Sequence, residues 1–351
     1  MLSGPPVYPA VFSFSDFLRQ GSIFRFLPSY IDEWRLNMYD DLILRAEDKK
    51  INWYPGHMAR ARRQLADQLS RVDVVVELCD ARIPRASRNP DLEELVKNKK
   101  RLLVLNKADL AQENVTRAWL AYYRTQGIDC MSFDATRGRA KEVISRIEKC
   151  AAEAVARMAA RGVKKTVRVM IVGVPNVGKS TFTNKINGAA IAKTGDRPGV
   201  TRSNQWVRIT PYLELLDTPG LLWPKLENQQ DAKALAYVGT INDQVMDQQM
   251  LSIQLMEHLM DIGHSDAVTM RFKLKDAQKR GVARLEEACR GRGWLMPGGV
   301  CDTDRGSAVI LDEFRAGKIG RITLQTPPAR KTEAPKEKQS VGSEEQSKNA
   351  E

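Results

Sequence analysis

A chain of 351 residues with 42% hydrophobic content is long enough for two domains that each bury a core. The formal net charge of +12 favours a polyanionic partner such as nucleic acid, although it could also serve only solubility. The five cysteines include no CxxC pair, which argues against a disulfide framework and a zinc site. No apolar run approaches the roughly 20 residues that a membrane helix needs. We therefore expect a cytoplasmic protein.

The first segment, residues 1–45, is rich in Phe, Ser and Pro and has no clear period. We expect a flexible extension. Two alternatives stay open: a targeting peptide, which Arg19 and Arg25 support poorly as the only basic residues before Ile31, and a true start at Met38.

From Ile51 onward, buried-looking strands alternate with helical patterns. The expected strands are 72–78, 101–105, 129–133, 166–172, 205–209 and 212–216, and the expected helices are 57–70, 90–98, 113–126, 139–161 and 179–186. This alternation is typical of an α/β domain with a parallel-rich sheet and helices on both faces. We place this domain at 46–228.

After Trp223 the strand patterns stop, and Met, Leu and Ile recur at helical spacing. We expect a small all-α domain at 229–326, where a Met-rich face is more typical of a core than of a binding surface. The tail, 327–351, has almost no large apolar side chain and is expected to be disordered. Its five basic and five acidic residues cancel, so the excess positive charge belongs to the folded parts.

The stretch GVPNVGKS, residues 173–180, fits the phosphate-loop pattern between a strand and a helix. Its glycines let successive N–H groups face phosphate oxygens. Lys179 would reach the terminal phosphates, and the Ser180 hydroxyl would bind Mg²⁺. The pattern predicts nucleotide contacts from Asn176, Val177, Gly178, Lys179, Ser180 and Thr181.

Two further loops fit the switches of a nucleotide hydrolase. DTPG, 217–220, follows a strand, so Asp217 can hold Mg²⁺ through water and the Gly220 N–H can touch the γ-phosphate. In RPGVT, 197–201, Thr201 is the candidate for a second Mg²⁺ hydroxyl that is ordered only when a γ-phosphate is present.

The tetrapeptide NKAD, 106–109, predicts recognition of guanine. The Asp109 carboxylate would accept from N1–H and N2–H of the base, and adenine would leave this acceptor unpaired at about 1 to 3 kcal/mol. Asn106 and Lys107 would pin the loop and stack on the base. Asp134 and Ala135 in FDATRG would form a second base loop, although a Ser-Ala-Lys-like tripeptide is more usual there.

These motifs run in an unusual order: base loops first, then the phosphate loop, then the switches. Because all of them follow strands of one predicted sheet, we interpret the order as a circular permutation in which helix 139–161 joins the usual chain ends. The second switch then leads straight into the helical domain, so loss of the γ-phosphate could reposition that domain.

The permuted order, with NWYPGHM (52–58), DARIP (80–84), NKAD, GVPNVGKST, PGVT and DTPGLLWP, resembles the ribosome biogenesis GTPase A family over roughly residues 50–325. The resemblance implies a GTPase with Mg²⁺ that is stimulated by the large ribosomal subunit and contacts its RNA through the helical domain. We expect a monomer. Two alternatives stay open: an organellar relative, and an RNA-binding placeholder with incidental turnover.

Catalysis needs a group that orients water, because Leu221 stands where many GTPases carry glutamine. His57 in WYPGHM is the candidate that the resemblance implies, beside Lys179 and the Gly220 N–H, although His57 could equally pack against Trp53. Asn176 resembles the asparagine that helps to hold K⁺ in potassium-activated GTPases. A simple loop hydrogen bond is the alternative.

Two basic segments could contact RNA phosphates. Residues 271–292 carry eight Lys or Arg against three acids, and Arg60, Arg62 and Arg63 form a second cluster. A solvated helix face is the alternative, and charge alone does not say which RNA sequence is bound.

Overall fold

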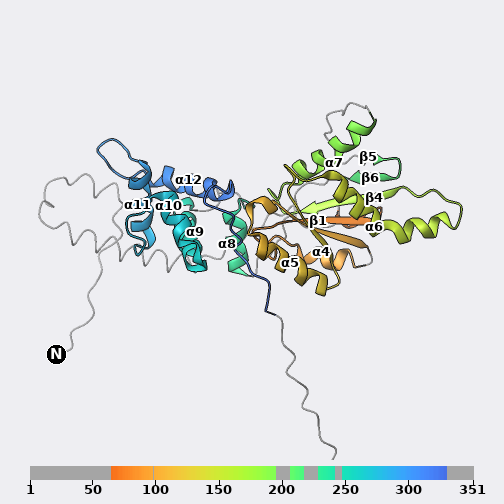
Figure 1. Ribbon diagram of the computed structural model, residues 1–351, viewed down its shortest axis with the longest axis horizontal. Coiled ribbons are helices and arrows are strands. Elements are labelled where there is room, and N and C mark those ends of the chain that lie inside the picture. The colour runs from red at the N-terminus through yellow and green to blue at the C-terminus, as the bar shows by residue number, and fades with distance from the viewer. Residues whose placement is uncertain (1–64, 98, 195–205, 217–227, 242–246, 330–351) are drawn as a thin grey trace, which may run out of the picture.

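The computed structural model describes residues 65–97, 99–194, 206–216, 228–241 and 247–329 (Figure 1). A six-stranded sheet has the order β3-β2-β1-β4-β6-β5. The strands are β1 (Val74–Asp80), β2 (Lys100–Asn106), β3 (Asp129–Phe133), β4 (Val167–Gly173), β5 (Trp206–Thr210) and β6 (Leu213–Leu216).

The five strands β3, β2, β1, β4 and β6 are mutually parallel, so their carboxyl ends share one edge of the sheet. β5 pairs antiparallel with β6, because a connection of only two residues, Pro211 and Tyr212, can form nothing but a hairpin. The sheet is therefore parallel-rich, as expected.

Helices cover both faces of the sheet. They are α4 (Pro90–Leu95), α5 (Glu113–Thr125), α6 (Ala140–Ala159) and α7 (Lys179–Thr194), with the short turn η1 (Ala108–Leu110) after β2. Val74, Val76 and Leu78 of β1 share one core with α6 and α7, whereas Val75 and Cys79 face α4 and α5. This alternation along one strand is the consequence of a period of two residues.

The predicted elements agree with the structure to within two residues for every strand. α7 is longer than expected and runs to Thr194 rather than ending near 186, and α4 is shorter, ending at Leu95. Of the helix expected at 57–70, only residues 65–69 are helical within the described ranges. The domain limits 46–228 and 229–326 stay predictions, and the segment 1–45 lies outside the described residues, as does most of 327–351.

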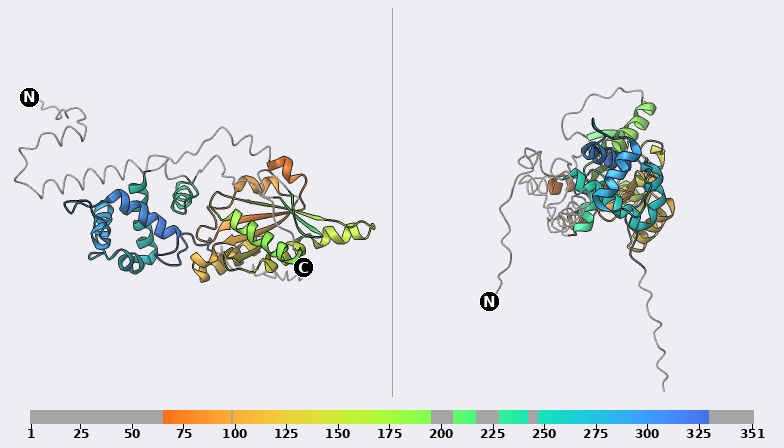
Figure 2. Two further views of the ribbon diagram at one scale, coloured as in Figure 1. Left: turned by 90° about the horizontal axis from the view of Figure 1, so that it is seen from above. Right: turned by 90° about the vertical axis from the view of Figure 1, so that its left-hand side faces the viewer.

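The C-terminal region is helical, with α8 (Gln229–Tyr237), α9 (Gln248–Leu259), η3 (Met260–His264), α10 (Ser265–Phe272), α11 (Gly281–Arg292) and α12 (Thr303–Arg315). Side chains cap three of these helices: Asn228, Asp247 and Asp302 each accept from main-chain N–H groups of the first turn. Met256 and its apolar neighbours on α9 are buried, which agrees with the expected core. Figure 2 shows this region at one end of an elongated molecule and the sheet at the other.

After α12 the chain returns to the sheet, which the sequence did not predict. We call residues 317–325 the return segment. Leu324 N donates to Arg82 O at 2.8 Å, and Ile322 N donates to Leu110 O at 3.1 Å. The indole Nε1 of Trp119 on α5 donates to Gln325 O at 2.8 Å. The segment therefore ties the helical region to the loops at the carboxyl edge of the sheet.

The five cysteines are free thiols: Cys79, Cys130 and Cys289 are buried, and Cys150 and Cys301 are half-buried. In the described part of the chain, no group of His, Cys, Asp and Glu side chains is arranged to hold a metal ion. The helices of the described ranges also include none with the length and apolar character needed to cross a membrane.

Candidate nucleotide site

The phosphate loop, residues 173–180, joins the carboxyl end of β4 to the start of α7. Gly173 has no room for a side chain, because a Cβ there would lie 2.6 Å from Leu78 O. Gly178 adopts φ +95°, which favours glycine. The ammonium of Lys179 donates to Gly173 O at 3.1 Å and to Val174 O at 2.9 Å, and its side chain is only 9% exposed. The loop thus curls around this lysine, as a phosphate cradle requires.

Ser180 lies in the first turn of α7, where helix N–H groups point toward the loop. Its side chain is exposed, and its hydroxyl forms no hydrogen bond with any described residue. A free hydroxyl at this position fits a Mg²⁺ ligand. Thr181 beside it is exposed as well. The other expected site residues, Thr201, Asp217, Gly220 and His57, lie outside the described residues.

The base loop, residues 106–109, begins at the last residue of β2 and continues into the turn η1. Lys107 adopts φ +57°, which turns the loop sharply after the strand. The Asp109 side chain is half-buried and makes no hydrogen bond or ion pair within the described ranges. Its carboxylate is therefore available to the two donors of a guanine edge.

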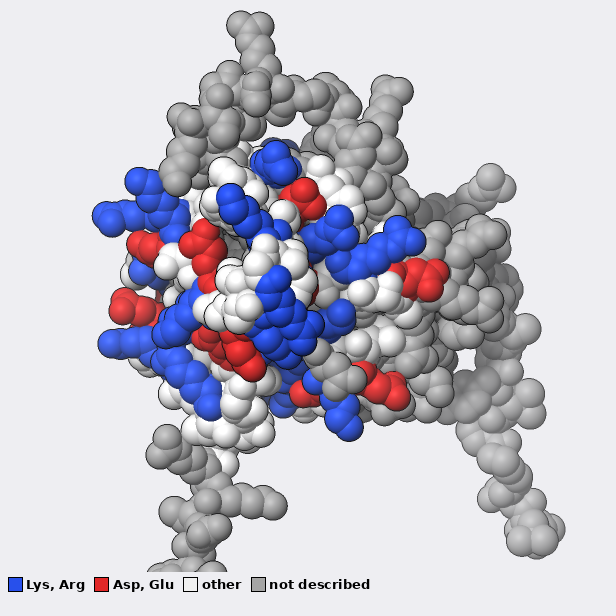
Figure 3. Space-filling view, turned by 90° about the vertical axis from the view of Figure 1, so that its right-hand side faces the viewer, with Lys and Arg blue, Asp and Glu red and all other residues white. Residues whose placement is uncertain are grey.

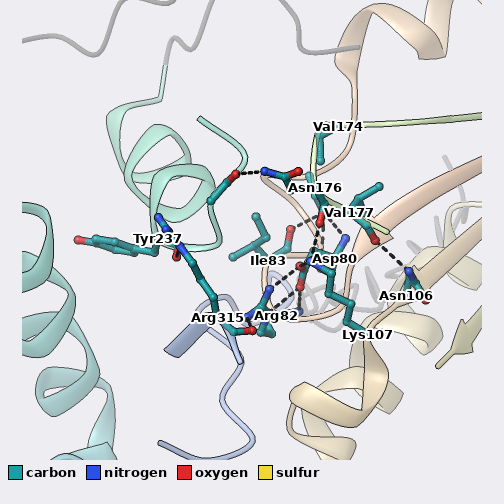
Figure 4. Close-up of polar contacts among 12 residues, drawn as sticks. Asp80, Arg82, Ile83, Asn106, Lys107, Val174, Asn176, Val177, Tyr237 and Arg315 are labelled. Carbon is teal, nitrogen blue, oxygen red and sulfur yellow. Dashed lines mark hydrogen bonds and ion pairs between the residues drawn. The ribbon is translucent and has the colours of Figure 1, made fainter. Parts of the chain in front are cut away.

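The base loop and the phosphate loop touch directly, although they lie far apart in the sequence (Figure 4). Asn106 Nδ2 donates to Val177 O at 2.9 Å, and Lys107 Nζ donates to Asn176 O at 2.6 Å. A Cβ on Gly178 would lie 2.7 Å from Asn106 Nδ2, so glycine is required for this approach. The two motifs therefore open on one site rather than on separate clefts.

The second expected base loop follows β3, which pairs with β2 so that Phe133 lies beside Asn106. Asp134 Oδ1 accepts from Thr136 N at 2.7 Å and from Thr136 Oγ1 at 2.6 Å. Burial raises the pKa of this carboxyl, but the Thr136 hydrogen bonds outweigh burial and hold the pKa below its ordinary value. Asp134 thus shapes its own loop, and Ala135 is buried beneath it.

A buried ion pair lies directly beside the base loop. Asp80, the last residue of β1, pairs with Arg82 at 2.8 Å and with Lys107 Nζ at 3.1 Å, and both Asp80 and Arg82 are 1% exposed. Burial raises the pKa of Asp80, but Arg82 and Lys107 outweigh it and hold the pKa far below its ordinary range. Asp80 is therefore an ionised carboxylate that orients both cations.

Arg82 also contacts the helical region. Its Nη1 donates to Arg315 O at 3.1 Å and to Phe314 O at 3.4 Å, and its guanidinium lies 5.5 Å from the centre of the Phe314 ring. One side chain thus connects the base loop, through Asp80 and Lys107, to the last turn of α12 (Figure 4).

A second connection starts at the phosphate loop. Asn176 Nδ2 donates to Gly239 O, just after α8, at 2.5 Å. Gly239 adopts φ +77°, and Arg315 Nε would lie 3.1 Å from a Cβ placed there. Arg315 in turn donates from Nε to Tyr237 O at 3.1 Å. The ends of α8 and α12 therefore meet where the phosphate loop touches them.

Comparison with known proteins decides the family. Residues 168–282 match the family model described as 50S ribosome-binding GTPase. Over 279 residues the chain is 42% identical to ribosome biogenesis GTPase A of Bacillus cereus, which covers 79% of this chain and 94% of that protein. The chain belongs to the ribosome biogenesis GTPase A family. The corresponding protein of Priestia megaterium is 43% identical over 280 residues, 79% of this chain and 97% of that protein.

Solved structures of this family support the same fold. The GDP-bound structure of TM YlqF matches with a TM-score of 0.57 and 28% identity, covering 75% of this chain and 99% of that one. GNP-bound YlqF from T. maritima matches with a TM-score of 0.56 and 26% identity, over 76% and 98% of the two chains. The expected fold class, a circularly permuted P-loop GTPase domain followed by a helical region, is confirmed.

Mitochondrial relatives are also present: mitochondrial ribosome-associated GTPase 1 of Xenopus tropicalis is 34% identical, over 60% of this chain and 70% of that protein. The family of GTPases binds GTP and typically Mg²⁺. Ser180 is the described residue that would hold this ion, and Asp217 and Thr201 are the expected further ligands. The ion supplies positive charge against the phosphate oxygens when it is bound.

Sequence reasoning missed several residues that join the site to the helical region. Asp80 and Arg82 were noted only as part of the family motif DARIP, without a function, and Gly239 and Arg315 were not noted at all. A signal existed for the first pair, because two opposite charges at the end of an apolar strand are expected to be paired when buried. No local pattern indicates the contact of Asn176 with Gly239.

Proposed function

We propose that the chain binds GTP between the base loop and the phosphate loop, hydrolyses it, and thereby limits its stay on a maturing large ribosomal subunit. The contact of Asn106 with Val177 carries this proposal, because it joins a base-recognising segment to a phosphate-binding segment. The free carboxylate of Asp109 and the enclosed ammonium of Lys179 support it at the two ends of the nucleotide. Asn106, Lys107 and Ala135 would complete the base side.

For hydrolysis, Lys179 would leave the two loop carbonyls and turn to the β- and γ-phosphates, where its charge is stabilising in the transition state. The N–H groups from Asn176 to Thr181 would hold the phosphate oxygens in place. We assign water positioning to His57 and a γ-phosphate hydrogen bond to the Gly220 N–H.

The GTP state would be communicated to the helical region through the two connections described above. Arg82 links the base loop to α12, and Asn176 links the phosphate loop to the end of α8. Any shift of the phosphate loop on γ-phosphate loss would displace the ends of α8 and α12 together. Arg315, the last residue of α12, holds them together because its Nε donates to Tyr237 O at the end of α8. Release from the subunit after hydrolysis would follow from this displacement.

We propose that the chain contacts the ribosomal RNA of the large subunit. The helical region supplies less free charge than its sequence indicates, because six of the eight basic residues in 271–292 form ion pairs with carboxylates inside the region. Lys273 and Lys275 remain without an ion pair among the described residues. Residues 271–292 would therefore contact fewer than eight RNA phosphates. We propose that the protein acts as a monomer in the cytoplasm.

The decisive test of the nucleotide assignment is Asp109→Asn. This change should weaken GTP binding and shift the preference toward xanthosine triphosphate. The C2 atom of xanthine carries a carbonyl oxygen, which can accept from the amide, where guanine carries an amino group. Asp129→Asn, on β3 and away from the loops, is the matched control and should leave both affinities unchanged. Equal loss of both nucleotides in Asp109→Asn would contradict the assignment.

Single-turnover hydrolysis with and without purified large ribosomal subunits tests the timing function. A GTPase timer accelerates on the subunit, whereas an RNA-binding placeholder shows the same rate in both. The relatives named mitochondrial keep the organellar alternative open, and the N-terminal residue of the mature protein in cells distinguishes it from a cytoplasmic one.

A further inference from the structure

The amino edge of the sheet, opposite the nucleotide loops, gathers basic residues from three separate segments. Val74 at the start of β1 pairs with Lys100 of β2 and with Val169 of β4, so these three strands begin side by side. The residues just before them therefore share one end of the molecule. We call this the amino-end surface: Arg71, Lys97, Lys99, Lys100, Arg157, Arg161, Lys164, Lys165, Arg168 and Tyr212.

The charge of this surface is strongly one-sided. Residues 97–101 carry four basic side chains and no acid, and residues 149–168 carry six basic side chains against Glu153 alone. Figure 3 looks onto the end of the molecule that carries α6 and β4, and Lys and Arg side chains spread over it with fewer acids between them. The fold brings these two basic stretches, which are about 50 residues apart in the sequence, to the same end of the molecule.

Much of this charge is free, in contrast to the helical region. Arg71, Lys97, Arg157, Arg161 and Lys164 are exposed and make no ion pair with any residue that the structure describes. Lys100 pairs with Glu153 at 2.9 Å, but their side chains are 55% and 69% exposed. Such an exposed pair contributes little and can open without much loss.

A polar pocket of about 470 Å³ lies within the surface, lined among others by Arg71, Lys99, Lys165 and Arg168 around Asp73. The Asp73 carboxylate is already used, since it accepts from Lys165 at 2.8 Å and from Arg168 N at 3.0 Å. Arg168 is also paired, with Glu214 at 3.5 Å, so Arg71 and Lys99 give the pocket its net positive charge, which suits a phosphate group.

An exposed aromatic residue, Tyr212, is hydrogen-bonded to Val167, which lies between two residues that line this pocket, Thr166 and Arg168. Tyr212 is 60% exposed, and its carbonyl accepts from Val167 N at 2.7 Å, which fixes it at the start of β4. Exposed aromatic rings among cations are what unpaired nucleic-acid bases stack on. The ring and the pocket thus offer the two kinds of contact that a single RNA strand makes.

We propose that the amino-end surface binds single-stranded RNA, with its phosphates on the free lysines and arginines and a base on Tyr212. An acidic membrane fits less well, because Val163 and Tyr212 are the exposed large apolar side chains at this end of the described chain, and two do not form an inserting face. The surface is separate from the nucleotide site and needs no GTP hydrolysis, so either proposal can fail alone.

The test is binding of the full chain to a fluorescein-labelled single-stranded RNA oligonucleotide of mixed sequence, measured by anisotropy over a range of salt. The variant Arg157→Gln/Arg161→Gln/Lys164→Gln should bind at least tenfold more weakly at about 0.1 M salt, and its salt slope should fall by about 2, because each phosphate contact adds roughly 0.7. Arg117→Gln/Arg124→Gln/Lys141→Gln removes the same charge from exposed, unpaired positions elsewhere and should bind as the parent does.

A second variant separates stacking from charge. Tyr212→Ala should weaken RNA binding several-fold while leaving the salt slope unchanged, since it removes no charge. Thermal unfolding should match the parent in all variants, because these side chains are exposed. GDP affinity should match the parent in the amino-end variant and in Tyr212→Ala, whose side chains lie at the edge of the sheet opposite the nucleotide loops.

Three outcomes would overturn the proposal. The two triple variants could lose affinity equally, which would show that net charge alone matters. The amino-end variant could bind RNA as the parent does. It could also lose binding to equimolar phosphatidylcholine and phosphatidylglycerol vesicles while keeping RNA binding, which would assign the surface to acidic lipid.

Discussion

The side-chain amide of Asn106 donates to the main-chain carbonyl of Val177 at 2.9 Å, across 71 residues of sequence. Asn106 ends β2 and Val177 lies in the phosphate loop after β4, and β1 separates the two strands in the sheet. The order of motifs along the chain is permuted, but the parallel strands bring their carboxyl ends to the same edge. The geometry of the site depends on the sheet and not on the order of its connections.

Removing this contact should weaken nucleotide binding. Asn106→Ala leaves the buried Val177 carbonyl unpaired and frees the phosphate loop from the base loop, so we expect a loss of about 1 to 3 kcal/mol, or roughly 5- to 150-fold in GTP affinity. Equilibrium titration with a fluorescent GTP analogue measures it. Asn184→Ala, an exposed residue of α7, is the matched control. Unchanged affinity in Asn106→Ala would show that the loops are held together by other contacts.

The buried pair of Asp80 and Arg82 should be essential for stability. Arg82→Met leaves the Asp80 carboxylate buried with Lys107 as its remaining partner, and breaking a buried pair costs about 3 to 5 kcal/mol. Urea unfolding gives this difference. Arg85→Met is the comparison, because Arg85 pairs with Asp231 at 2.9 Å while its side chain is 47% exposed, so we expect less than about 1 kcal/mol.

The double variant Asp80→Asn/Arg82→Met distinguishes the pair from the contacts of Arg82 with α12. If the charge pair dominates, the double variant is more stable than Arg82→Met alone. If the hydrogen bonds of Arg82 to the carbonyls of Phe314 and Arg315 contribute most of the stability, the double variant is no more stable than Arg82→Met.

The strands could be predicted because each is a short apolar run between polar turns. In β1, the residues from Val74 to Leu78 alternate between two covered faces, and the sequence shows this as a run of apolar residues in which Glu77 is the one charged residue. Glu77 is buried and pairs with Arg101 of the next strand, so it does not break the strand. Local pattern was sufficient here.

The return segment could not be predicted, because its sequence has no period and its contacts are long-range. Main-chain groups of Ile322 and Leu324 bond to loops more than 200 residues earlier, and Gly317 adopts φ +71°, a conformation that favours glycine. The pairing of the basic run 271–292 was hidden for the same reason. Glu313 of α12 pairs with both Arg271 and Arg292, and nothing near those residues in the sequence indicates it.

The attachment of the return segment to the sheet domain should depend on the side chain of Gln325. Its Oε1 accepts from Arg85 N and Ala86 N at 3.1 and 3.0 Å, and its Nε2 donates to Asp231 at 2.7 Å. Gln325→Ala leaves two N–H groups of the loop after β1 unpaired, so we expect a loss of about 1 to 3 kcal/mol in stability. Hydrogen exchange should accelerate at Ala86 and at Leu324. The same change at exposed Gln126 should alter neither.

Stability should fall as the pH drops below about 6.5, the ordinary pKa of histidine. Burial lowers the pKa of His258, and this outweighs a hydrogen bond with the Leu324 main chain and the charge of Asp261, which raise it. The folded state therefore favours neutral imidazole, and its stability is complete above pH 6.5 and is lost as protons bind at lower pH.

Thermal unfolding between pH 7.5 and 5.5 measures this loss, which His258→Gln should reduce. Burial also lowers the pKa of His264, so His264→Gln measures how much of the loss of stability at low pH comes from His264. An identical pH dependence in the parent and in His258→Gln would exclude His258 as the source.

The side-chain amide of Asn176 allows a test of whether GTP hydrolysis depends on potassium. Because Gly239 O is an acceptor only, the Nδ2 end of the Asn176 amide must face it, and the Oδ1 end is left without a hydrogen bond from any described residue. An amide oxygen in the phosphate loop is a suitable ligand for K⁺, whose charge would act beside Lys179 on the phosphates. The hydrogen bond to Gly239 would then orient the ligand, and ion binding would stiffen the contact with α8.

We therefore expect GTP turnover to be faster in K⁺ than in Na⁺ at equal ionic strength, and this difference to vanish in Asn176→Ala. Gly239→Ala is the informative partner variant, because it strains the φ +77° backbone and moves the carbonyl without touching the loop itself. If Gly239 orients the amide, Gly239→Ala should reduce the ratio of the rates in K⁺ and Na⁺ while Asn184→Ala leaves it intact. Equal rates in the two ions for the parent protein would remove the ion from the mechanism and leave Asn176 as a purely structural link to α8.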